Sequence, residues 1–237
     1  EPKTIEITHQ DPNVEIRYTT DGSDPTTSSG LFYGVPIVIT GLDPNVTLKV
    51  KCFKTGYTSS DIVSGSYTFK LPNVSFNPVG GEYNSAIELY LSQPVTGSTI
   101  WYTTDGSDPD VGVGTQFTGT TPVTVANGMT VKAISGRDKW LKSDVVSHSY
   151  TLKLNKPIFI TDATKNYTGE IKVQIEIIPR SASIKYTVDG SDPKSSATSL
   201  LYTGPIPISS ETKIRCYGYK SGWNDSDINE KTYKFGN

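Results

Sequence analysis

The chain has 237 residues and a formal net charge of −2, with 22 Lys and Arg against 24 Asp and Glu that are interspersed along it. This balance excludes the basic stripe that a nucleic-acid-binding protein needs. The sequence contains no apolar run long enough for a transmembrane helix, so we expect no membrane insertion. Gly (21), Pro (15) and Tyr (14) are frequent, which is typical of short strands joined by turns.

One pattern occurs three times along the chain. Residues 16–25, 100–109 and 184–193 all read Ile-x-Tyr-Thr-x-Asp-Gly-Ser-Asp-Pro, and 84 residues separate each copy from the next. A fixed period indicates an array of repeated units. This period is too long for a solenoid unit but suits a small β-domain. We therefore predict three domains, at residues 1–70, 71–154 and 155–237.

The expected elements follow the same order in each copy. An alternating strand such as residues 171–177 comes first, followed by the motif strand and its Asp-Gly-Ser-Asp-Pro turn. A loop, an edge strand with Pro, a further strand, a loop with one large aromatic residue and a closing strand come next. About seven short strands at this spacing predict an all-β fold of three tandem immunoglobulin-like or fibronectin-III-like β-sandwiches. The short junctions, 69–72 and 152–157, predict a semi-rigid rod.

The first copy is shorter at its start than the other two. Segments of about 72–86 and 156–170 precede the first alternating strand of the second and third copies, whereas almost nothing precedes Ile5 and Ile7. We expect either a fragment of a longer protein cut inside the first repeat or a mature amino terminus; in both cases the opening strand is missing. A missing strand would leave an open edge that could pair with another chain.

The two cysteines align in this scheme. Val50-Lys51-Cys52 matches Val131-Lys132-Ala133 and Ile214-Arg215-Cys216, so Cys52 and Cys216 are expected at equivalent places two domains apart. Such sites in a rod lie too far apart for a disulfide. Because the second copy has Ala there, we expect both to be buried structural thiols.

Each motif contains two carboxylates that are candidates for a calcium site. The pairs are Asp21 and Asp24, Asp105 and Asp108, and Asp189 and Asp192. The favoured alternative is that Asp caps the turn, because no further acidic ligand recurs in the loop that follows. A glycosidase pair is disfavoured, since a catalytic pair is rarely copied into every unit of an array. His9 and His148 do not recur either, so we expect no catalytic site and no cofactor beyond this weak calcium candidate.

Aromatic residues are the best candidates for ligand binding. Tyr57, Trp140 and Trp223 recur on one loop, where a ring can stack on a sugar or anchor a partner protein. The favoured alternative is that each ring folds over the edge of its own sandwich. Trp101 stands at an outward position held by Arg17 and Lys185 in the other copies, and with Tyr90 on the neighbouring strand it would form an exposed patch for a ligand or partner.

The ordered motifs resemble a known module. The motifs that carry this resemblance are, in order, Tyr-Thr-x-Asp-Gly-Ser-Asp-Pro, the aromatic and Pro-Ile pair, Gly-Tyr/Trp-x-x-Ser and the closing Tyr. The pattern is similar to the small carboxy-terminal β-sandwich of bacterial chitobiases and β-hexosaminidases, which recurs as a fibronectin-III-associated domain in surface and secreted proteins. This resemblance covers all three copies. It implies a non-catalytic accessory sandwich of extracellular proteins and brings no catalytic site.

These observations favour a structural array in a larger protein. The leading hypothesis is an extracellular or cell-surface spacer that holds further domains of the same parent chain. One alternative is a carbohydrate-binding accessory module of a glycan-active enzyme, with a polysaccharide as partner and Trp101, Trp140, Trp223 and Tyr57 as contacts. Another is an adhesin segment that binds a cell-surface protein. Aromatic rings at equal spacing would favour multivalent binding of a repetitive ligand.

Overall fold

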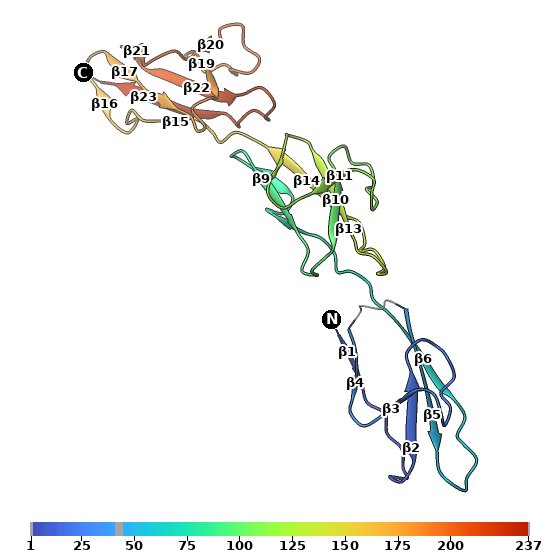
Figure 1. Ribbon diagram of the computed structural model, residues 1–237. Helices are drawn as coiled ribbons and strands as arrows, with labels where there is room; N and C mark the ends of the chain where they lie inside the picture. Colours follow the sequence, from blue (N-terminus) through green and yellow to red (C-terminus); the bar gives the residue numbers. More distant parts are fainter. Residues whose placement is uncertain (1, 41–44, 237) are drawn as a thin grey trace.

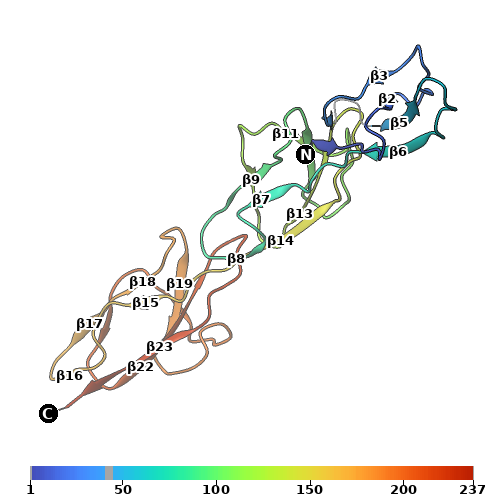
Figure 2. The same cartoon turned by 90° about the horizontal axis from the view of Figure 1, so that it is seen from below.

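The computed structural model describes residues 2–40 and 45–236. Their helical and strand structure is entirely β, in strands β1–β23, and none of these residues lies in a helix that could cross a membrane. Figure 1 shows three β-units end to end in chain order, and Figure 2 shows the same row from below. Every sheet is built from strands of one unit. The predicted tandem β-sandwiches are therefore confirmed.

The second unit is a sandwich of two sheets. Its strands are β7 (Ser75–Asn77), β8 (Gly81–Tyr83), β9 (Glu88–Ser92), β10 (Thr99–Thr103), β11 (Thr115–Phe117), β12 (Val123–Thr124), β13 (Thr130–Gly136) and β14 (Val146–Leu152). The larger sheet has the order β11-β10-β13-β14-β8 and the smaller β12-β9-β7. The opening segment thus crosses from one sheet to the other, because β7 pairs with β9 and β8 pairs in parallel with β14.

The third unit repeats this arrangement. Its strands are β15 (Ile158–Phe159), β16 (Asn166–Tyr167), β17 (Ile171–Val173), β18 (Ile175–Glu176), β19 (Ser183–Thr187), β20 (Leu200–Leu201), β21 (Ile206–Ile208), β22 (Thr212–Tyr219) and β23 (Asn229–Phe235). The larger sheet has the order β16-β23-β22-β19-β20, and its strand β16 is again parallel to the closing strand. The smaller layer consists of the pairs β15-β18 and β17-β21.

The first unit has a smaller set of strands. They are β1 (Lys3–Ile5), β2 (Glu15–Thr19), β3 (Leu31–Phe32), β4 (Ile37–Ile39), β5 (Asn45–Phe53) and β6 (Val63–Thr68). The larger sheet is β3-β2-β5-β6 and the smaller is β1-β4. Within the described residues, this unit has no counterpart of the opening strands β7 and β8 or β15 and β16. That the opening strand of this unit is missing stays a prediction.

Alternating side chains build the core of each unit, as the period of two predicted. In β9, Leu89 and Leu91 are buried and Tyr90 between them is exposed. The Pro of the motif turn is also buried in every copy, at Pro25, Pro109 and Pro193. The first unit contributes a smaller buried cluster than the others: Ile37, Ile39, Val46, Leu48 and Phe69. Its sandwich is the least completely closed.

The strand register corrects the predicted alignment of the cysteines. The motif tyrosines Tyr18, Tyr102 and Tyr186 pair with Val50, Ala133 and Cys216. Cys52 pairs instead with Ile16 and is half-buried, so its predicted equivalence with Cys216 and its predicted full burial are both wrong. The sequence fitted two registers because β5 carries Lys at both 49 and 51. Cys216 is buried, as predicted, and burial raises the pKa of its thiol to about 12.

Candidate functional site

The repeated carboxylates build the motif turn. Asp189 Oδ1 accepts hydrogen bonds from the amide of Ser191 at 2.9 Å and from its hydroxyl at 2.5 Å. Asp21 and Asp105 accept the same pair of bonds in the other units. The Gly that follows has a φ of 76–82° in all three copies, a left-handed conformation that favours glycine. The predicted role of Asp as a turn cap is therefore what the geometry shows.

The second Asp of the motif is held by a neighbouring cation or amide. Asp24 lies 2.6 Å from Lys49 Nζ, and Asp108 lies 2.7 Å from Lys132 Nζ. Asp192 accepts a hydrogen bond from the amide of Lys194 at 2.8 Å. Among residues 2–40 and 45–236, no three His, Cys, Asp or Glu side chains are grouped so that they could hold a metal ion. Calcium binding at these pairs stays a prediction.

The Asp189 carboxyl should titrate far below a free aspartate. Hydrogen bonds from the Ser191 side chain and amide, and then from Thr198, lower its pKa from 3.8 to about 2. Because the native pKa is depressed, the carboxylate stabilises the fold fully above pH 3.8, and this contribution is lost as the pH falls towards 2. An NMR titration of the Asp189 carboxyl carbon checks this. A midpoint near 3.8 would show that the cap does not form in solution.

The aromatic residue of the long loop sits in the same turn in every unit. The amides of Tyr57, Trp140 and Trp223 each donate to the carbonyl oxygen three residues earlier, at 3.0–3.1 Å. That earlier residue is Lys54, Arg137 or Lys220, and its cationic group lies over the aromatic ring at 4.7–5.0 Å from the centroid. The local sequence thus presents one ring in one orientation at the amino-terminal end of each unit.

Trp140 belongs to the joint between the first and second units. Its ring packs against the core of the first unit, with its centroid 5.1 Å from that of Phe69. The next residue, Leu141, donates its amide to the Phe69 carbonyl at 2.9 Å and accepts the Leu71 amide at 3.0 Å. Asp144 completes the joint with an ion pair to Lys70 at 2.6 Å.

Trp223 occupies the equivalent position in the second joint. Its ring packs against the cores of both the second and the third unit. Asn224 donates its amide to the Leu152 carbonyl at 2.7 Å and accepts the Leu154 amide at 3.1 Å. Asp227 pairs with Lys153 at 3.1 Å, which raises the pKa of the lysine and lowers that of the carboxyl.

The two joints therefore share one set of contacts, which we call the latch. It consists of a loop ring, two backbone hydrogen bonds of the residue after it, one donated by its amide and one accepted by its carbonyl, and a Lys–Asp ion pair. The predicted packing of the ring on its own sandwich holds for Trp223, which packs on the preceding unit as well. It is wrong for Trp140, whose ring packs on the preceding unit. The part of the latch that lies in the linker was not predicted from the sequence. Its signal was present, because Phe69-Lys70-Leu71 and Leu152-Lys153-Leu154 share the pattern apolar-Lys-Leu.

Trp101 and Tyr90 do not form the predicted patch. Trp101 lies in β10 of the larger sheet, paired with Ile134 and Gln116. Tyr90 lies in β9 of the smaller sheet and is 42% exposed. Since both alternate with core residues, they point outward from opposite sheets. Trp101 is half-buried, and its Nε1 is buried without a hydrogen-bond partner in the described part of the chain.

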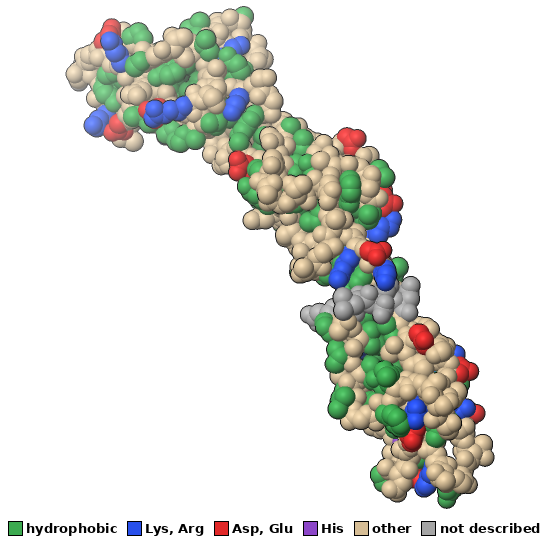
Figure 3. Space-filling view, viewed as in Figure 1, with side chains coloured by type: hydrophobic (Ala, Val, Ile, Leu, Met, Phe, Trp, Pro, Cys, Tyr) green, Lys and Arg blue, Asp and Glu red, His purple; other side chains and the backbone are tan. Residues whose placement is uncertain are grey.

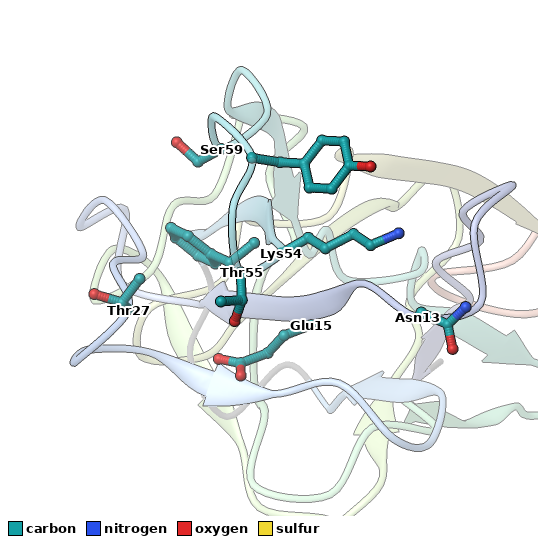
Figure 4. A pocket seen from close by; sticks show the side chains of 8 residues that line it. Asn13, Glu15, Thr27, Lys54, Thr55 and Ser59 are labelled. Atoms are coloured by element: carbon teal, nitrogen blue, oxygen red, sulfur yellow. The ribbon is translucent and has the colours of Figure 1, made fainter.

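Tyr57 is the most exposed of the loop rings, at 72%. It borders a hollow of about 560 Å³ that is also lined by Asn13, Glu15, Thr27, Phe53, Lys54, Thr55 and Ser59. Figure 4 shows the polar side chains around this hollow, with Lys54 between Asn13 and Thr55. Lys54 also pairs with Asp11 at 2.6 Å, and this contact lowers the pKa of that carboxyl. Ligand contact at the aromatic residues stays a prediction.

Two family models match consecutive parts of the chain. The chitobiase/β-hexosaminidase C-terminal domain matches residues 78–147 and again 162–230. The Fn3-associated model matches residues 5–67. The two matches to the first model together cover more than half of the chain. No curated protein matches the sequence.

Several solved structures resemble the chain weakly. Domains 7, 8 and 9 of the S-layer protein SbsC share 10% identity over 81% of this chain and 70% of that one, with a TM-score of 0.26. Extracellular domains 3–5 of Drosophila OTK share 10% identity over 99% and 91%, with a TM-score of 0.28. Fibronectin(III)-like modules of Clostridium thermocellum CbhA share 12% identity over 69% and 95%, with a TM-score of 0.26.

Proposed function

Because the chain belongs to the chitobiase/β-hexosaminidase C-terminal domain family, we propose that it is a non-catalytic spacer array of an extracellular protein. It would hold other domains of its parent chain away from a cell or polymer surface. The matched model describes a C-terminal domain, which supports an accessory role. The extracellular placement rests on the resemblance of these repeats to modules of secreted and surface proteins.

The observation that carries this proposal is the repeated latch. A flexible linker would leave adjacent units free to reorient, since few contacts would cross the boundary. Here each boundary has a packed ring, two backbone hydrogen bonds and an ion pair between the linker and the following unit. Each exposed ion pair contributes little, about 0–1 kcal/mol, so the rings and the buried Leu71 and Leu154 provide most of the stabilisation.

A measurement of relative orientation tests the spacer function. Residual dipolar couplings collected from all three units in one aligned sample should fit a single alignment tensor, because the latches hold the units in fixed orientations. Small-angle scattering should give the extended profile of the row in Figure 1. Separate tensors for the three units, or a compact scattering profile, would contradict a semi-rigid spacer.

A second candidate function is carbohydrate binding at the hollow beside Tyr57. An exposed ring next to several hydrogen-bonding side chains is the arrangement that a sugar needs, with one face for stacking and polar groups for its hydroxyls. Trp140 and Trp223 are less suited to this role, because their rings pack in the joints.

Retention on insoluble polymers distinguishes the two functions. Retention would be measured for the wild-type chain, Tyr57→Ala and Trp101→Ala, each with and without a calcium chelator. The polymers would be chitin, cellulose, xylan and peptidoglycan. Retention on one polymer that Tyr57→Ala abolishes would establish a carbohydrate-binding module. Loss of retention on chelation would point to the calcium candidates. No retention on any polymer leaves the spacer function.

A further inference from the structure

The first unit has an apolar groove where the other units have a strand. The groove has a volume of about 510 Å³ and lies between the chain after β1 and the strands β5 and β6. Its apolar lining is formed by Ile5, Ile7, Leu48, Val50, Val63 and Tyr67. Figure 3 shows hydrophobic side chains gathered on the surface of this unit. Val63 is 71% exposed, so part of what should be core faces solvent.

The second unit shows what fills the equivalent space. Its opening segment runs along β9 and then along β14, and it buries Val74 and Phe76 in the core, at 3% and 7% exposure. Phe76 packs against His148, whose ring centroid lies 4.7 Å away. The place of His148 is taken in the first unit by Gly65, which lines the groove.

The third unit fills the space in the same way. Its strand β15 pairs with β18 and β16 runs parallel to β23. Phe159 and Tyr167 from these strands pack on the core. Two independent copies therefore place an extended segment with alternating apolar residues in this position.

The hydroxyl group of the closing-strand tyrosine differs between the units at the same place. The closing-strand tyrosine Tyr150 donates to the carbonyl oxygen of Pro78 at 2.9 Å, and Tyr233 donates to that of Thr161 at 3.1 Å. Both acceptors belong to the opening segment. The equivalent Tyr67 has no hydrogen-bond partner for its hydroxyl among the residues that the structure describes, and its side chain lines the groove.

We propose that this groove is a receptor for an extended peptide strand with apolar residues at alternate positions, of the type of Asn73–Asn84. The strand would pair with the free edge after β1 and continue beside β6. Its apolar side chains would lie over Leu48 and Val50. One of its backbone carbonyls would accept a hydrogen bond from the Tyr67 hydroxyl. Main-chain hydrogen bonds to an open edge and pockets for alternate side chains are the general basis of strand addition. This inference does not depend on the spacer function.

Peptide binding to the whole 237-residue chain tests the proposal. A synthetic peptide of residues 73–84 should produce saturable NMR shift changes confined to β1, β5 and β6. The same peptide with Phe76→Asp should bind at least tenfold more weakly, because it places a charge in the groove. Val63→Glu in the chain should weaken binding by a similar factor. Its matched control is Val38→Glu, which changes an exposed strand residue outside the groove and should have no effect.

A fusion of the peptide to the chain tests the proposal even if the free peptide binds weakly. Residues 73–84 joined ahead of Glu1 through a flexible linker should raise the Tm of the first unit by at least about 4 °C, and the Phe76→Asp fusion should not. The proposal is overturned if neither the peptide at about 1 mM nor the fusion has an effect, or if Val63→Glu leaves binding unchanged. Concentration-dependent dimerisation that Val63→Glu abolishes would assign the groove to a second copy of the chain instead.

Discussion

Trp223→Ala should release the joint between the second and third units while both sandwiches stay folded. The ring contacts the cores of both units, so its removal takes away apolar contact from each. Full burial of Trp is associated with a cost of about 3–5 kcal/mol on truncation to Ala. Because Trp223 is half-buried, we expect about 2 kcal/mol. Residual dipolar couplings should then require separate alignment tensors for the second and third units.

Tyr57→Ala is the matched control for this experiment. Tyr57 sits in the same turn beneath the same kind of cation, but its ring is 72% exposed. Its replacement should change the free energy of unfolding by no more than about 0.5 kcal/mol and leave the alignment of the units unchanged. Equal effects of the two substitutions would show that the ring stabilises its own loop and not the joint.

The fold could be predicted because it depends on local patterns that recur. The alternation of Leu89, Tyr90 and Leu91 and the turn residues Asp189 and Gly190 each act through their immediate neighbours. Comparison of the three copies also distinguishes the residues that recur at equivalent positions of every sandwich from those that differ between copies. The shorter start of the first copy was visible for the same reason.

The joints could not be predicted, because they depend on how consecutive units are placed. The sequence shows that Trp140 and Trp223 recur, but a ring on a loop can cover its own core, a neighbour or a ligand. Only the positions of Phe69 and Leu152 in space decide among these. The shift of Cys52 against Cys216 has a similar origin, since only the cross-strand partners Ile16 and Tyr186 fix the register.

Tyr150→Ala should be the most damaging single change in the second unit. Its side chain is fully buried, with its ring 6.3 Å from that of Tyr83 and its hydroxyl bonded to Pro78. Truncation should cost about 3–5 kcal/mol. A unit of this size has a total stability of about 4–12 kcal/mol, at about 0.05–0.15 kcal/mol per residue, so much of it would be lost. Hydrogen exchange resolved by unit should show protection lost in residues 71–154 first.

The equivalent change in the first unit separates the two structural reasons for this effect. Tyr67→Ala should cost less than half as much, since Tyr67 is half-buried and faces the open groove. The substitution Tyr150→Phe keeps the ring but removes the hydrogen bond to the carbonyl of the half-buried Pro78, so it should cost about 1 kcal/mol. Tyr67→Phe should cost almost nothing, because its hydroxyl has no described partner to lose.

If the two Phe variants were equally destabilised, the first unit would be closed in solution and its groove already filled. Equal protection in the two Ala variants would lead to the same conclusion. The closing-strand tyrosine therefore reports whether an opening strand is in place.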